Sequence, residues 1–106
     1  MDVDKLNINS LKSEFSKYRK DLLHLNEYMY KNPELGYQEV NSVDKITKLI
    51  KKHVLDTKYK KFSNIPTAFT ASINKKSGKK NIAICIEYDA LPNVGHACGH
   101  NLISSI

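Results

Sequence analysis

An unbroken apolar run near the end of the chain, residues 82–86, constrains the fold more than any other stretch. The run reads Ile-Ala-Ile-Cys-Ile and shows no polar alternation. A strand with one face in solvent alternates apolar and polar side chains, whereas a strand covered on both faces does not. The run therefore predicts an interior strand of an α/β sheet. We expect Cys85 to be a small core residue within that strand.

A first helix is predicted by apolar residues with gaps of four and three, which form one stripe along a helix. Asn9 or Ser10 is a suitable N-cap. Pro33 should end the helix near Lys31, because the residue before a proline is pushed out of helical geometry. The stripe is too short for a coiled coil, so the helix should face a core. Its members are Leu11, Phe15, Tyr18, Leu22, Leu25 and Met29.

A turn and a second helix should follow. Gly36 lies in the turn, where we expect a backbone conformation closed to other residues. The second helix should begin near Gln38, with Glu39 in its first turn, where a negative charge suits the helix dipole. Lysines should point outward from this helix. The residues expected to point inward are Val43, Ile46, Ile50 and Val54.

The pattern then changes from helical to β. Tyr59 and Phe62 predict a short strand, and the β-forming residues 67–73 predict a second one. The polar stretch 74–80 predicts a hairpin into the run at 82–86. A further helix should begin just before the end of the chain. The expected fold class is thus α/β, with two helices, then β-strands and the start of a third helix.

Composition limits the classes of protein that fit. At 106 residues and 12.1 kDa the chain is one domain at most, and its balance of apolar and charged residues is that of a soluble protein. No apolar run approaches the roughly 20 residues that span a bilayer, and the N-terminus lacks the features of a secretory signal. Two cysteines make no disulfide framework. We therefore expect a cytoplasmic protein without a membrane partner.

The net charge of +6 raises the question of nucleic-acid binding. The excess comes from lysines, many of them on the outer face of the second expected helix or in the polar stretch 74–80. Arginine does not alternate with aromatic residues, and no nucleic-acid-binding motif is recognisable. A solvated lysine-rich surface explains the charge, so we expect no nucleic-acid partner.

Thiol, imidazole and carboxylate groups gather after the apolar run. Glu87 and Asp89 follow it directly, at the strand end where α/β sheets bind ligands. Cys98 and His100 come next, separated by Gly99. Side chains two positions apart diverge on a helix, so joint metal binding requires a turn, which glycine permits. A thiolate and an imidazole near a carboxylate suit zinc, and Asp89 could accept the second N–H of a ligating imidazole.

Other interpretations of this cluster stay open on spacing alone. A Cys-Gly-His triplet also arises by chance in proteins that bind no metal. Cys98 could instead act as a nucleophile with a histidine as base, and the sequence does not distinguish His96 from His100 as that base because the two are so close together.

Three stretches of the sequence resemble one known family. They are residues 32–39 (Asn-Pro-Glu-Leu-Gly-Tyr-Gln-Glu), residues 66–71 (Pro-Thr-Ala-Phe-Thr-Ala), and the pair 87–92 and 95–102 (Glu-Tyr-Asp-Ala-Leu-Pro and Gly-His-Ala-Cys-Gly-His-Asn-Leu). These are similar to motifs of the dinuclear zinc metallopeptidases of the aminoacylase and carboxypeptidase G type, in particular their amidohydrolase branch. That branch includes aminobenzoyl-glutamate hydrolases, indole-acetyl-amino-acid hydrolases and dipeptidases.

The resemblance implies roles for individual residues. Cys98 and His100 match metal-binding positions of the branch, and Asp89 matches a supporting carboxylate. Glu87 stands where many relatives carry a ligating histidine, and His96 and Asn101 belong to the motif without an assigned role. The complete site would hold two divalent ions, zinc or manganese.

The resemblance also implies an architecture and an activity. Residues 1–106 would form the N-terminal part of a three-layer α/β/α catalytic domain. The complete protein would be a homodimer that hydrolyses the amide bond of a small N-acyl amino acid or dipeptide. The family's general base and further ligands come from later sequence. The alternative is a truncated, inactive chain that acts at most as a metal-binding or interaction module.

Overall fold

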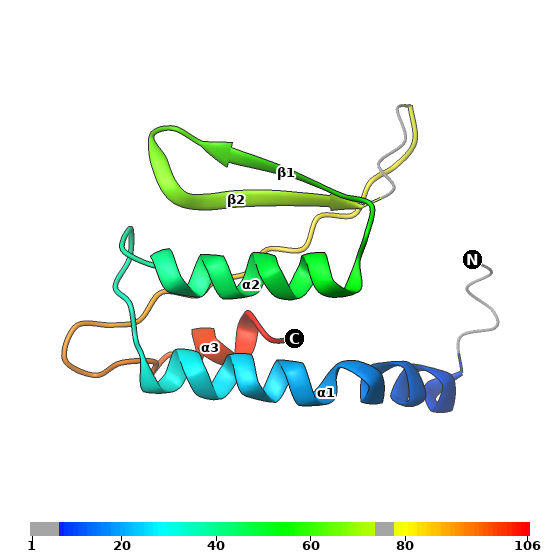
Figure 1. Ribbon diagram of the computed structural model, residues 1–106, viewed down its shortest axis with the longest axis horizontal. Coiled ribbons are helices and arrows are strands. Elements are labelled where there is room, and N and C mark those ends of the chain that lie inside the picture. The colour runs from blue at the N-terminus through cyan, green and yellow to red at the C-terminus, as the bar shows by residue number, and fades with distance from the viewer. Residues whose placement is uncertain (1–6, 74–77) are drawn as a thin grey trace.

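Residues 7–73 and 78–106 are described by a computed structural model of the chain. The two long helices lie side by side, and the strands form a hairpin on the side of α2 that faces away from α1 (Figure 1). This order of two helices, strands and a short third helix confirms the expected α/β fragment. The elements are α1 (Ile8–Lys31), α2 (Val40–His53), β1 (Thr57–Phe62), β2 (Ile65–Ile73) and α3 (His100–Ile103).

Helix α1 begins earlier than the sequence suggests and ends where expected. Its N-cap is Asn7, whose side-chain oxygen accepts a hydrogen bond from the Asn9 backbone N–H at 2.6 Å, so the prediction of Asn9 or Ser10 is wrong. The chain offers several capping side chains in succession, and the first of them takes the position. The last helical residue, Lys31, is the predicted one. Within residues 7–73 and 78–106, no helix is both long and apolar enough to cross a membrane.

The apolar stripe of α1 is buried only in its C-terminal part. Leu25 and Met29 are buried, whereas Leu11 and Phe15 are more than half exposed. The buried pair packs with Ile46 of α2 to form the centre of the core. Partly buried residues surround this centre: Tyr28, Leu49, Ile50, Phe69, Ile86 and Tyr88.

The turn into α2 differs from the prediction in two ways. Its left-handed residue is Tyr37, with φ of 68°, and not Gly36. Glu39 is the N-cap of α2 and is buried, so it does not lie in the first turn as expected. Its side chain makes no capping hydrogen bond, because the carboxylate of Glu34 has taken that role. A carboxylate from an adjacent turn can cap a helix as effectively as the N-cap residue itself, since both satisfy the same N–H groups.

Glu34 accepts four hydrogen bonds at the start of α2. They come from the backbone N–H and side chain of Asn41, at 3.0 and 3.1 Å, and from the backbone N–H and hydroxyl of Ser42, both at 2.6 Å. Partial burial alone would raise the pKa of Glu34, but these donors together hold that pKa below its ordinary value. The carboxylate thereby joins the 32–39 turn to the helix that follows it.

We expect Glu34→Gln to destabilise the chain by about 0.5–2 kcal/mol, the usual worth of a helix cap. Because the folded-state pKa is depressed, the contribution of Glu34 is present above the ordinary carboxyl pKa of 4.5 and is lost as pH falls through the folded value. Urea unfolding at neutral and acidic pH measures both effects. Glu27→Gln, which breaks only an exposed pair with Lys31, is the control. Equal losses for both variants at neutral pH would contradict the capping role.

Strands β1 and β2 form an antiparallel hairpin that confirms both predicted strands. Thr57 pairs with Ile73 at one end, and Phe62 pairs with Ile65 around the turn, after a register shift. The hairpin predicted over residues 74–80 falls partly on residues 74–77, which lie outside the described residues. In the described part of the chain, the only strand paired with β2 is β1.

The apolar run 82–86 does not form the predicted interior strand. Ile82 and Ile84 are 94% and 84% exposed, and Cys85 is exposed too, so its expected place in the core is also wrong. Of the run, only Ile86 packs against the core cluster. A strand is defined by its hydrogen-bonded neighbours, and none of the described residues forms a ladder with this run. In the described residues the sheet has two strands, β1 and β2, and the run 82–86 is not part of it. The run therefore lacks the cover on both faces that an interior strand would have.

Candidate metal centre

The loop that carries the candidate ligands is anchored to the 32–37 turn. The Ala90 N–H donates to the Glu34 carbonyl at 2.7 Å, and Ala90 forms a parallel bridge with Leu35. Leu91 and Gly95 then exchange two backbone hydrogen bonds, at 2.9 and 3.1 Å, which close the loop on itself. Gly95 has a φ of 63°, a conformation that glycine adopts at little cost. The backbone on both sides of the loop is therefore fixed.

The three stretches of the family resemblance meet around residues 88–90. The Tyr88 ring stacks on Phe69 of β2 with centroids 6.1 Å apart, and its hydroxyl donates to the Thr67 carbonyl. The bridge between Ala90 and Leu35 joins the first stretch to the third. Residues far apart in sequence thus pack around one short segment, with Asp89 at its centre.

His100 lies between two carboxylates. Its Nδ1 is 2.8 Å from Oδ1 of Asp89, and its Nε2 is 3.1 Å from Oε2 of Glu87. Gly99, with φ of 76°, makes the expected turn between Cys98 and His100, and His100 is the first residue of α3. The imidazole is only 20% exposed, so its orientation is set by packing as well as by the two acids.

This arrangement places an acidic side chain beside each ring nitrogen of His100. If the Nδ1–H donates to Asp89, a neutral ring would direct its Nε2 lone pair at the Glu87 carboxylate, which is repulsive. A metal cation at Nε2 would relieve that repulsion. An imidazole nitrogen and a carboxylate oxygen are donors of the kind that zinc binds, and both lie at this point.

Cys98 lies two positions before His100 in the sequence. Its side chain is exposed and makes no hydrogen bond with a histidine among the residues that the structure describes. In the same residues, no group of three or more histidine, cysteine or acidic side chains is arranged so that it could hold an ion. The structure thus brings Asp89 and His100 together, adds Glu87, and leaves Cys98 on the adjacent turn.

Two buried polar residues near this site have unsatisfied atoms. His96 is 7% exposed, and neither ring nitrogen makes a hydrogen bond of good geometry in the described part of the chain, although the Met29 backbone lies near the ring. Burial lowers the pKa of His96, and the nearby His100 lowers it further, against the opposing effects of Asp89 and the Met29 backbone. The second residue, Glu39, is also buried, with Oε2 unpartnered in the same described residues. A buried polar atom without a hydrogen-bond partner destabilises the folded state unless another group forms a hydrogen bond with it or binds it.

The sequence pattern assigns no site role to Glu39 or Asn101. Burial raises the pKa of the Tyr88 phenol, and the negative charges of Glu39 and Asp89 raise it further. Glu39 therefore acts electrostatically on Tyr88. The one feature of the sequence that could have drawn attention to Glu39 is its position as the last residue of the 32–39 stretch. Asn101 has a structural role, since its amide donates to Asn26 Oδ1 at 2.7 Å and ties α3 to α1.

The curated proteins similar to this chain are peptidases and a deacetylase. The Xaa-Arg dipeptidase of Mus musculus is 33% identical over 89 residues, covering 77% of this chain and 21% of its own length. The human Xaa-Arg dipeptidase is 29% identical over 92 residues, with the same coverage. The N-acetyldiaminopimelate deacetylase of Oenococcus oeni is 30% identical over 98 residues, covering 78% of this chain and 26% of its own length. No protein-family profile matches the chain.

These relatives and the motif residues indicate that the chain resembles peptidases and amidohydrolases. Over about three quarters of its length the chain is thus similar to peptidases and a deacetylase, in keeping with its resemblance to the metallopeptidases of the aminoacylase and carboxypeptidase G type. It spans about a fifth to a quarter of the length of the curated relatives that it matches.

Proposed function

We propose that this chain supplies part of the metal site of a metal-dependent amidohydrolase or peptidase. Cys98 and His100 are the proposed ligands, and Asp89 is the residue that orients His100. The observation that carries the proposal is the 2.8 Å contact between Asp89 Oδ1 and His100 Nδ1, with the other ring nitrogen facing the Glu87 carboxylate. A carboxylate on one nitrogen of a histidine is the usual support for a metal on the other.

The chain's own residues would prepare the site in a simple way. Asp89 would accept a hydrogen bond from the Nδ1–H of His100, which would fix the tautomer and leave Nε2 available as a ligand. Glu87 adds a negative charge close to Nε2. When bound, a divalent ion would polarise a substrate carbonyl and make a bound water more acidic. Packing by Tyr88 and the Ala90 bridge would hold these groups in place.

The remaining features of this function are proposals that rest on the family. The substrate is a small N-acyl amino acid or dipeptide, in keeping with relatives named as dipeptidases and a deacetylase. The complete site holds two divalent ions, zinc or manganese, with the further ligands supplied by sequence equivalent to the rest of the relatives. The complete protein is a cytoplasmic homodimer with neither a membrane nor a nucleic acid as partner.

A second candidate is a non-catalytic chain that binds metal weakly or acts as an interaction module. It is favoured by the absence of a three-ligand group within residues 7–73 and 78–106. A catalytic zinc normally has three protein ligands and an open position. The exposed apolar side chains of Ile82 and Ile84 would suit an interaction role.

Titration with Co²⁺ tests the ligand assignment. Because a thiolate bound to Co²⁺ gives a sulfur-to-metal charge-transfer absorption, we expect wild type to show this band and Cys98→Ser to lose it. Cys85→Ser is the matched control, since both cysteines are free and exposed. A band that survives in Cys98→Ser and disappears in Cys85→Ser would refute the assignment of Cys98.

Hydrolysis separates the two candidate functions. Metal-dependent cleavage of a dipeptide by the 106-residue chain, lost in His100→Ala, would favour the enzyme. Metal binding through Cys98 without any cleavage would favour the second candidate.

A further inference from the structure

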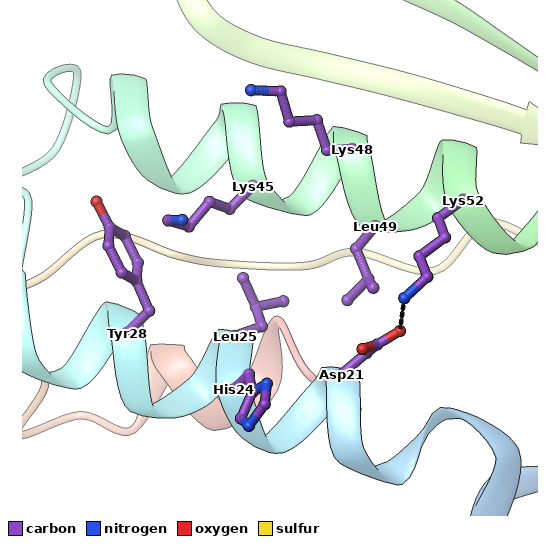
Figure 2. Close-up of a pocket in the computed structure, with 8 residues that line it drawn as sticks. All are labelled: Asp21, His24, Leu25, Tyr28, Lys45, Lys48, Leu49 and Lys52. Carbon is purple, nitrogen blue, oxygen red and sulfur yellow. Dashed lines mark hydrogen bonds and ion pairs between the residues drawn. The ribbon is translucent and has the colours of Figure 1, made fainter.

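A groove with a volume of about 290 Å³ lies between α1 and α2 (Figure 2). It shares no lining residue with the 87–100 segment, so it is separate from the candidate metal centre. Leu25 and Leu49 point into the space between the two helices and make its centre apolar (Figure 2). The full lining is Asp21, His24, Leu25, Tyr28, Lys45, Lys48, Leu49 and Lys52.

The charges along the groove are unequal, with three lysines against one aspartate. Two of the lysines already have carboxylate partners. Lys52 contacts Asp21 at 2.7 Å, and Lys48 contacts Asp44 at 2.7 Å. In Figure 2 the ammonium of Lys48 points away from α1, outside the space between the helices. Neither of these lysines therefore offers an unpaired charge to a ligand.

Lys45 is different, because it makes no ion pair among the described residues. Its ammonium lies 4.0 Å from the centre of the Tyr28 ring, at one end of the groove. A cation on a ring face keeps N–H donors free to meet an anion. The single carboxylate of the groove, on Asp21, is occupied by Lys52 and also by His53 at 2.8 Å. The groove thus combines a free positive charge with an apolar surface and, among its described lining residues, no free acid.

We propose that this groove binds a small organic anion, with its carboxylate on Lys45 and a compact aliphatic body on the partly buried Leu49, above the buried Leu25. The charge distribution excludes a cation, because Asp21 is already paired. The leucines favour an organic anion over an inorganic one, since burying apolar surface adds to the ion pair. The volume is at the lower end for ligand pockets, which limits the ligand to a few carbon atoms.

Hexanoate is a suitable probe, titrated into the ¹⁵N-labelled 106-residue chain and followed by amide chemical shifts. We expect saturable shifts at groove residues, with a dissociation constant on the order of millimolar for a ligand of this size. Lys45→Gln should weaken binding at least about threefold, and added salt should weaken it in wild type as well. Lys48→Gln is the matched control, since Lys48 lines the groove but is paired with Asp44. It should leave the affinity unchanged.

Two further probes separate charge from apolar contact. Hexanamide keeps the aliphatic body and lacks the charge, whereas inorganic phosphate keeps a charge and lacks the body. Both should bind more weakly than hexanoate. The proposal would be overturned if hexanoate caused no saturable shifts in the groove, if hexanamide or phosphate matched its affinity, or if Lys45→Gln bound as tightly as Lys48→Gln.

Discussion

Replacing Met29 with alanine is expected to destabilise the chain by about 2–5 kcal/mol. Met29 is 0% exposed and lies at the centre of the core cluster, against Leu25 and Ile46. Its sulfur also accepts a hydrogen bond from the Ser104 hydroxyl at 3.3 Å, so truncation loosens the attachment of the α3 region. A cavity at this position is surrounded by the few residues that hold α1 and α2 together. Because a domain of this size has only a few kcal/mol to lose, a large part of the population should unfold.

Thermal or urea unfolding followed by circular dichroism measures this loss. Leu23→Ala is a matched control on the same helix, because Leu23 is half exposed and its truncation leaves no internal cavity. Met29→Leu, which nearly conserves volume, should cost less than about 1.5 kcal/mol. A Met29→Ala variant as stable as Leu23→Ala would show that this core does not hold the helices together.

Sequence periodicity predicts the end of α1 but not how much of its stripe is buried. Pro33 enforces the end at Lys31 through local sterics, which the sequence contains in full. Burial depends on what packs against the helix, and Leu11 remains 52% exposed. The two halves of the stripe therefore have the same apolar pattern in the sequence, but only the second half is buried in the fold.

The interior strand expected at 82–86 illustrates the same limit. The run has a β-forming composition, but strand formation needs hydrogen-bonded neighbours, and composition does not specify them. The hairpin that does form, β1 with β2, is closed by a short turn between Phe62 and Ile65, so its partners are local. Cys85 is exposed for the same reason, because it belongs to the run that lacks such neighbours among the described residues.

At the candidate site, local chemistry predicts the pairing of Asp89 with His100, and the Gly99 turn makes it possible. The sequence could not reveal that Glu87 reaches Nε2, because that contact depends on the return of the chain through the 90–99 loop. The sequence also could not reveal that Glu39 and His96 are buried with polar atoms that lack a hydrogen-bond partner in the described residues. Their burial depends on how the surrounding elements pack over them.

His100→Ala is expected to lower the Zn²⁺ affinity of the chain by at least about 100-fold, because it removes the imidazole ligand. Asp89→Ala should lower it by about 10–100-fold, the usual effect of losing a carboxylate that orients a ligating histidine. Competition with a chromophoric chelator measures both affinities. His24→Ala is the control, since His24 is exposed on α1 and lies outside the 87–100 segment.

Asp89→Asn distinguishes orientation of His100 from a general loss of structure. The asparagine side chain keeps an oxygen that can accept the Nδ1–H of His100 but lacks the negative charge. If Asp89 acts by orienting the ring, Asp89→Asn should keep part of the affinity that Asp89→Ala loses, and circular dichroism should remain that of wild type in both variants. Equal affinities for the two variants would indicate that the charge of Asp89, and not its hydrogen bond, matters. Unchanged affinity in His100→Ala would remove His100 from the site, and with it the proposal that this loop is a metal centre.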